Sequence, residues 1–143
     1  MVDPLFLTLA EAIELHADQI HRYGGQAGLR DLALIEFALA QPEASFAGEW
    51  LHGEHYAMAA AYAYHLCQNH PFIGGNKRTA LAAVLVFLEL NGIPILDPRG
   101  RLKNAMIRIA SWQDEQSGLR RALKKIASTR LERQRPIHFV ACP

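Results

Sequence analysis

The chain has 143 residues, of which 50% are hydrophobic and 20% are charged, and this balance fits one globular domain with a single core. Lys and Arg number 15 against 14 Asp and Glu, so the formal net charge is only +1 at pH 7. This charge excludes bulk electrostatics as an argument for nucleic-acid binding, and the apolar content excludes a disordered chain. Cys67 and Cys142 form neither a disulfide framework nor a CxxC pair. The longest strongly apolar run, residues 80–88, is too short to cross a membrane, so we expect a cytoplasmic protein without a membrane partner.

The N-terminal third predicts two helices. Thr8 and Glu11 have the capping-box spacing, in which each side chain satisfies a backbone amide at the start of a helix. Gly24 and the glycine after it supply the end of this helix. A second helix is expected over 29–40, where leucines and an isoleucine recur at helical spacing, and Pro42 opposes its continuation.

The next segment, 41–53, is a polar connector that contains Phe46 and Trp50. Because an aromatic ring buries a large apolar area, we expect both rings to pack on the core. The alternative is an exposed lid or a partner contact.

Two later segments predict central helices. Residues 54–68, EHYAMAAAYAYHLCQ, and 77–90, KRTALAAVLVFLEL, are apolar or small nearly all round, which is typical of helices surrounded by others. A strand is the alternative for the second run, but its length exceeds that of most strands. Asn91 and Gly92 end it.

The remaining elements complete an all-α fold. Residues 93–100 contain two prolines and a glycine and predict a loop, and amphipathic helices are expected around 102–109 and 119–126. We therefore expect a bundle of about six helices around two buried central helices. The expected organisation is a single domain over 1–143, with a core at about 5–127 and a basic C-terminal tail at 128–143.

The segment between the central helices, NHPFIGGNKR over 69–78, concentrates residues with chemical potential. Gly74 and Gly75 allow backbone amides to turn toward a ligand, and the first turn of the next helix offers unpaired N–H groups and a positive dipole end. Asn76 can cap this helix or hydrogen-bond an oxygen of the bound group. Lys77 and Arg78 would repel the helix dipole unless an anion lies between them. This pattern predicts an anion site.

His70 precedes the anion site and can act as a general base, because an imidazole titrates near neutral pH. Phe72 is interpreted as the anchor that holds the loop in the core. The alternative interpretation is a plain helix–helix turn, with His70 capping the preceding helix and the basic pair solvated.

The run HPFIGGNKRTA resembles the signature of the Fic/Doc superfamily, in which His-Pro-Phe is followed by any residue, Asp or Glu, Gly or Ala, Asn, Gly or Lys, and Arg. The KRTA ending is similar to the Doc variant, the toxin half of bacterial toxin–antitoxin pairs, rather than to the Gly-containing variant of adenylyltransferases. The similarity extends over roughly 5–127 and includes GLRD at 28–31, Glu36, Ala38 and Leu39 upstream, and FLELNG at 87–92 downstream.

The resemblance implies a Fic-like helical fold and an enzyme that uses ATP. It makes His70 the base that activates a protein hydroxyl, and it gives phosphate binding to Gly75, Asn76 and Arg78, with Lys77 as the Doc-type lysine. Doc-type enzymes transfer the terminal phosphoryl group to a protein such as a translation elongation factor, whereas Gly-containing relatives transfer a nucleotidyl group. An antitoxin is the implied inhibitory partner.

Gly74 departs from this pattern, because the family has Asp or Glu there to hold Mg²⁺. Three explanations stay open. The phosphates and water alone hold the ion, or a carboxylate such as Glu43, Glu49 or Asp31 reaches in, or the protein is catalytically weak.

The remaining histidines and the basic C-terminal stretch give weaker functional predictions. The nearest histidine pairs, His52 with His55 and His65 with His70, lack the HExxH spacing, and neither cysteine supplies a third ligand at a recognisable distance, so no zinc site is expected. His16 and His21 are interpreted as surface or cap residues. The basic stretch 120–135 lacks interleaved aromatics, which favours a solvated face or an acidic partner over nucleic acid.

Two hypotheses follow: a Doc-like toxin that modifies a protein hydroxyl, or a nucleotide- or partner-binding module in which catalysis has faded. For the enzyme, transfer of the terminal phosphoryl group is expected, and nucleotidyl transfer by a protein adenylyltransferase is the alternative reaction. The intact motif residues favour the first hypothesis, and Gly74 favours the second; those motif residues are His70, Asn76, Lys77 and Arg78.

Overall fold

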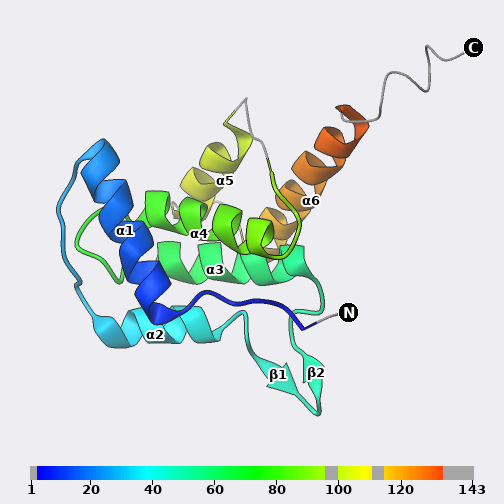
Figure 1. Ribbon diagram of the computed structural model, residues 1–143, viewed down its shortest axis with the longest axis horizontal. Coiled ribbons are helices and arrows are strands. Elements are labelled where there is room, and N and C mark those ends of the chain that lie inside the picture. The colour runs from blue at the N-terminus through cyan, green and yellow to red at the C-terminus, as the bar shows by residue number, and fades with distance from the viewer. Residues whose placement is uncertain (1–2, 96–99, 111–114, 134–143) are drawn as a thin grey trace, which may run out of the picture.

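A computed structural model describes residues 3–95, 100–110 and 115–133 (Figure 1). In this part of the chain, six helices and one two-stranded hairpin are formed, so the expected all-α fold of about six helices is confirmed. The elements are α1 (Leu9–Tyr23), α2 (Leu32–Ala40), β1 (Ser45–Phe46), β2 (Glu49–Trp50), α3 (His55–Asn69), α4 (Asn76–Leu90), α5 (Arg101–Ala110) and α6 (Gln116–Arg133).

Local signals set the bounds of α1. The Thr8 hydroxyl accepts a hydrogen bond from the Glu11 amide at 3.1 Å, and the Glu11 carboxylate accepts one from the Thr8 amide at 3.0 Å. Gly24 ends the helix with φ 78°, where its amide donates to the Ile20 carbonyl. The predicted capping box and glycine stop are confirmed.

The second helix begins later than expected. Asp31 is its N-cap and accepts a hydrogen bond from the Leu34 amide at 3.3 Å. Leu29 is instead paired with Phe72 in an isolated antiparallel bridge. The prediction of helix over 29–31 is wrong because these residues pair with the loop that precedes α4.

The connector between α2 and α3 contains the antiparallel hairpin, in which Ser45 pairs with Trp50. Trp50 packs edge-on against Phe6 at a centroid distance of 5.4 Å. Phe46 is 81% exposed, so the expectation that both rings pack on the core is correct for Trp50 and wrong for Phe46.

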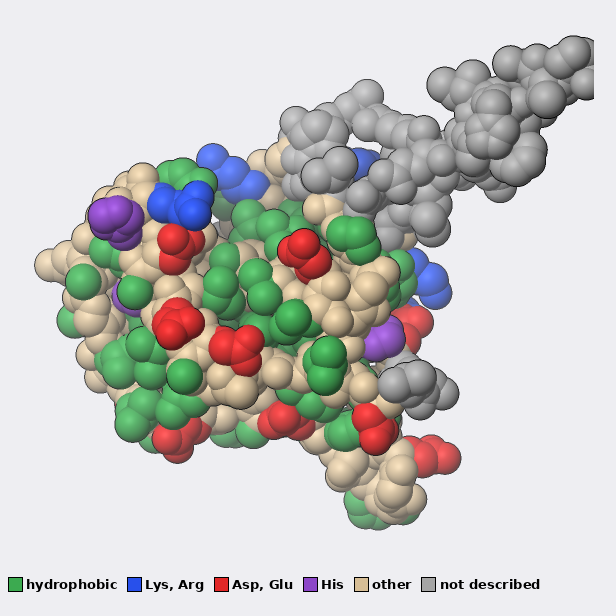
Figure 2. Space-filling view, viewed as in Figure 1, with side chains coloured by type: hydrophobic (Ala, Val, Ile, Leu, Met, Phe, Trp, Pro, Cys, Tyr) green, Lys and Arg blue, Asp and Glu red, His purple; other side chains and the backbone are tan. Residues whose placement is uncertain are grey.

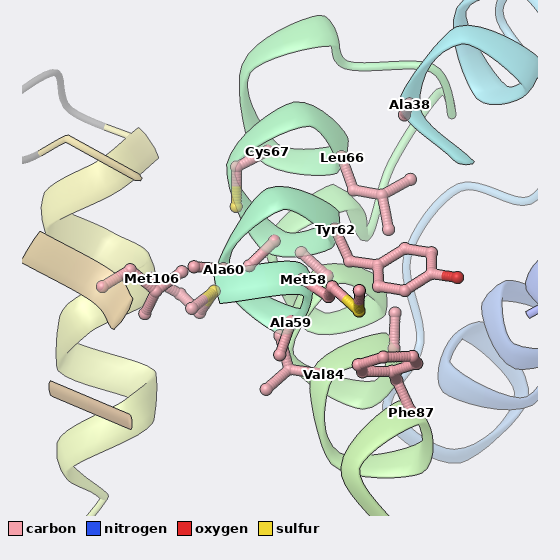
Figure 3. Close-up of a cluster of buried hydrophobic side chains, with 14 of the residues drawn as sticks. Ala38, Met58, Ala59, Ala60, Tyr62, Leu66, Cys67, Val84, Phe87 and Met106 are labelled. Atoms are coloured by element: carbon pink, nitrogen blue, oxygen red, sulfur yellow. The ribbon is translucent and has the colours of Figure 1, made fainter. Parts of the chain in front are cut away.

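The centre of the bundle is formed by α3 and α4, which α1, α2, α5 and α6 surround. Figure 3 shows the rings of Tyr62 and Phe87 side by side, with centroids 5.1 Å apart. The Tyr62 hydroxyl accepts a hydrogen bond from the Leu7 amide at 2.9 Å, which satisfies the polar end of this buried ring. Alanines at 59 and 60 are fully buried on α3 and leave room for close helix packing. The two predicted central helices are confirmed.

Several expectations concern residues outside the described ranges, among them Cys142, 96–99 of the predicted loop and 134–143 of the predicted basic tail. On α6, Arg120 forms an ion pair with Glu54, and the Lys124 ammonium lies 3.9 Å from the same carboxylate. Among the described helices, none combines the length and the apolar character that crossing a membrane requires.

Candidate functional site: the loop between α3 and α4

The loop over 70–75 turns the chain from α3 into α4, and Figure 1 shows it at the end of the bundle opposite the hairpin. His70 ends α3 with φ 47° and ψ 55°, a left-handed conformation that is costly for a residue with a Cβ. Its side chain is exposed. A strained residue persists only where the surrounding structure holds it, and such residues cluster at functional sites.

Arg30 stabilises this turn from the chain before α2. Its guanidinium donates hydrogen bonds to the carbonyls of His70 and Asn69 at 2.5 Å and 2.6 Å. These carbonyls lie at the C-terminal end of α3, where a cation is favoured by the helix dipole. The backbone amides of Arg30 and Asp31 also donate to the Pro71 carbonyl, and the Ile73 amide donates to Gly28. No local pattern identifies Arg30 as a support of this loop, because its acceptors lie about forty residues away in sequence.

The Asn76 side chain organises the loop itself. Its Oδ1 accepts a hydrogen bond from the Phe72 amide at 3.0 Å, and its Nδ2 donates to the Phe72 carbonyl at 2.9 Å. The residue in the N-cap position of α4 is Gly75, so the suggestion that Asn76 caps the helix is wrong. The Phe72 side chain is 1% exposed and lies in the hydrophobic core.

His16 of α1 contacts the same loop and is 4% exposed. Its ring stacks on Phe72 at a centroid distance of 3.8 Å, and its Nε2 lies 2.7 Å from the Gly74 carbonyl oxygen. The interpretation of His16 as a surface or cap residue is wrong. The missed signal is its place four residues after buried Ala12 and four before Ile20, on the apolar side of α1.

The two glycines of the motif differ in conformation. Gly75 is left-handed, with φ 73°, and Gly74 is not among the residues with positive φ. A Cβ built on Gly74 would lie 3.2 Å from the backbone nitrogen and oxygen of Gln26, so the position is packed against another backbone segment. At Gly75 a Cβ would lie 3.1 Å from Ile20 Cδ1, so α1 lies directly behind the start of α4.

Arg78 and Lys77 occupy the first turn of α4. The Arg78 guanidinium donates to the carbonyls of Gly24 and Gln19 at 2.7 Å and 3.5 Å. These carbonyls belong to the C-terminal end of α1, whose negative dipole end favours a cation. An anion is therefore not required to explain Arg78, contrary to the expectation from sequence. Lys77 is exposed. Figure 2 shows Lys and Arg side chains at the upper edge of the molecule near the end of α1, and acidic side chains scattered over the face below.

The first turn of α4 leaves the amides of Asn76, Lys77 and Arg78 without an intrahelical acceptor, since the first bond of the helix runs from Thr79 to the Gly75 carbonyl at 2.9 Å. A left-handed residue followed by a helical turn directs successive amides to one side. The arrangement can bind an anion such as a phosphate.

A cavity of about 530 Å³ extends along α4 from this first turn. Leu81 and Leu85 of α4 and Met106 and Ile107 of α5 form its apolar wall. Lys77 and Lys103 line it as well, so an apolar groove flanked by cations opens beside the anion site.

The loop itself offers no carboxylate at the position where the family pattern places one to hold Mg²⁺. Gly74 has no side chain, and its carbonyl faces His16. Asp31 uses a carboxylate oxygen to cap α2. Glu43 and Glu49 follow α2 and precede α3, at the far end of a helix about 22 Å long, which excludes them as ligands near Gly74. Across the described ranges, no group of three or more His, Cys, Asp or Glu residues could hold a metal ion.

Comparison with known proteins assigns the chain to a family. Residues 6–88 match the model of the Fic/DOC family. The matched region includes α1, α2, α3, the loop and nearly all of α4. The chain belongs to the Fic/DOC family.

Two curated relatives are similar to the chain. The "Toxin Doc" of Mycolicibacterium smegmatis is 38% identical over 73 residues, which cover 51% of this chain and 56% of the relative. The "Protein kinase doc" of Escherichia phage P1 is 36% identical over 87 residues, which cover 61% of this chain and 68% of that protein. The chain thus spans little more than half of the first relative and about two thirds of the second.

Proposed function

We propose that this protein is a Doc-type toxin that transfers the terminal phosphoryl group of ATP to a hydroxyl of a bacterial protein. The observation that carries the proposal is the loop between α3 and α4, which holds an exposed, strained His70 beside the free amides of α4. The two relatives, named as a toxin and as a protein kinase, support the same proposal.

The phosphates would be bound mainly by the backbone. The amides of residues 76–78 supply donors that the helix does not use, and the positive end of α4 favours negative charge. Lys77 adds an exposed cation at the edge of the groove. Arg78 adds positive charge near Gly75, although part of its guanidinium is held by α1. Asn76 acts indirectly by fixing Phe72 and thus the shape of the loop.

The proposed step is an in-line displacement at the γ-phosphorus. The hydroxyl oxygen of the target forms a bond to this phosphorus while the bond to the β–γ bridging oxygen breaks and ADP leaves. The hydroxyl proton goes to the imidazole of His70. Such reactions depend chiefly on positioning and on stabilisation of charge, which a loop held from several sides can supply.

Lys77 is the reason to favour phosphoryl over nucleotidyl transfer. Nucleotidyl-transferring relatives have glycine at this position, and the bulk and charge of a lysine in the first turn of α4 would change how the triphosphate lies. A serine, threonine or tyrosine of an elongation-factor-type protein is the proposed acceptor. A nucleotide-binding module without transfer is the second candidate, because Gly74 removes the acidic metal ligand.

We propose that an antitoxin covers the groove along α4. The groove joins an apolar wall, which includes Leu85 and Met106, to the cations Lys77 and Lys103. An amphipathic helix with acidic residues at its edge matches both features. A segment seated there would also cover the first turn of α4 and block phosphate binding.

Labelled ATP tests the reaction. The protein is incubated with bacterial lysate and ATP labelled at either the γ or the α phosphorus, with His70→Ala as the matched control. We expect a protein band from the γ label alone, present only with His70. A band from the α label would instead establish nucleotidyl transfer, and labelling that persists in His70→Ala would overturn the role of His70. If neither label marks any protein in lysates that have never contained the toxin, the binding-module candidate is correct.

The antitoxin surface has its own test. Leu85→Asp places a charge in the apolar wall of the groove. We expect this variant to lose capture by a co-expressed antitoxin while it still binds ATP. Undiminished capture would place the antitoxin elsewhere.

A further inference from the structure

His16 is a buried polar residue whose hydrogen bond and ring stack are both made with the motif loop. It lies on α1, 58 positions before Gly74, and is 4% exposed. The rings of His16 and Phe72 are nearly parallel, with an interplanar angle of 5°. The stack and the contact with Gly74 fix the imidazole in two directions, and a side chain fixed in this way can orient a backbone group.

The contact with Gly74 defines which atom of His16 carries a proton. A carbonyl oxygen only accepts hydrogen bonds, so the Nε2 of His16, at 2.7 Å, must be the donor. The bond holds the Gly74 carbonyl toward α1. In a trans peptide the C=O and the following N–H point in opposite directions, so the same bond turns the Gly75 amide away from α1.

The Gly75 amide precedes the free amides of α4. Gly75 is left-handed and is the N-cap of this helix, so its N–H joins the row of donors at residues 76–78. If the Gly74–Gly75 peptide flipped, it would present a carbonyl oxygen to the ligand in place of a donor. Glycine at both positions makes this peptide easy to flip unless something holds it.

We infer that His16 is a positioning residue that fixes the Gly74–Gly75 peptide with its amide facing a bound phosphate. The inference rests on the proposed function for the identity of the ligand. It also gives a reason for a polar side chain in the buried side of α1, since a purely apolar residue there would leave the Gly74 carbonyl without its donor.

Two substitutions of equal length separate the hydrogen bond from the ring. His16→Gln keeps an N–H donor, His16→Met does not, and both lose the stack on Phe72. The control is His21→Met, which removes an exposed histidine from the same helix. ATP binding is measured by calorimetry at a temperature at which melting curves show every variant to be folded.

We expect His16→Met to weaken ATP binding about tenfold, the effect of one hydrogen bond to a charged group, and His16→Gln to recover most of that loss. In the transfer reaction, the Met variant should raise KM for ATP more than it lowers kcat, because the defect is in phosphate binding. Equal affinities for the Gln and Met variants would overturn the inference, and so would an effect of the same size in His21→Met.

A second measurement uses the unaltered protein and needs no nucleotide. The Gly75 amide is followed in a ¹H–¹⁵N spectrum during titration with inorganic tripolyphosphate. We expect its resonance to shift together with those of residues 76–78. A silent Gly75 amide, with shifts at 76–78, overturns the role given to His16. Shifts at all four amides in a protein that does not bind ATP would support the positioning role while refuting ATP as the substrate.

Discussion

The left-handed conformation of His70 predicts that, of two variants that both lack the imidazole, the glycine variant is more stable than the alanine variant. At φ 47° a side chain with a Cβ is strained, and the expected cost is about 1–2 kcal/mol. Glycine at this helix end removes the strain but gains freedom in the unfolded chain, which offsets about 0.4–1 kcal/mol. We expect His70→Gly to be more stable than His70→Ala by about 1 kcal/mol, since alanine keeps the Cβ.

Urea unfolding measures this difference, because both variants lack the imidazole and differ only in the Cβ. Both should lose His70-dependent protein labelling completely. A difference in melting temperature of about 3–4 °C is expected from the free energy and the size of the chain. An alanine variant as stable as the glycine variant would show that the αL turn at His70 carries no strain and would remove one reason to regard it as a functional residue.

Three further predictions concern residues around the bundle. Arg30→Ala should lower the free energy of unfolding by about 1 kcal/mol and reduce transfer, because two carbonyls at the end of α3 lose their donor; unchanged stability would contradict this. Burial lowers the pKa of His52 and of His65, so the unfolded state binds more protons than the folded state at pH values between the folded and unfolded pKa. The melting temperature should therefore fall as pH drops from 7 through the folded pKa values. A His52→Gln/His65→Gln variant with the same pH dependence would contradict this. Burial raises the pKa of Cys67 to about 12, so in a Cys142→Ser background iodoacetamide at pH 8 should modify it only after unfolding, and rapid native labelling would refute this.

Much of the fold could be predicted because the signals are local. The Thr8 capping box and the Asn91–Gly92 stop depend on residues within one turn of a helix end, and both predicted bounds are correct. The two central helices follow from their small and apolar composition. The start of α2 could not be predicted from periodicity, because the bridge between Leu29 and Phe72 joins residues far apart in sequence.

The loop shows the same limit at the candidate site. Sequence placed His70, the two glycines and the basic pair in one short segment, and the structure keeps them together. The residues that support this segment lie about forty to sixty positions away, as the contacts of Arg30, His16 and Arg78 show. Their partners are backbone carbonyls, which carry no sequence pattern of their own, so no spacing rule could have identified these contacts.

We propose that His70 and the first turn of α4 transfer a phosphoryl group to a protein hydroxyl. The most direct measurement is a mass spectrum of the proteins from bacteria that express either the parent chain or His70→Ala. We predict one protein with a new phosphorylated serine, threonine or tyrosine in cells with the parent chain, and none with the variant. A nucleotidyl adduct in place of the phosphate, or inhibited growth with identical protein masses in both cultures, would contradict phosphoryl transfer by His70.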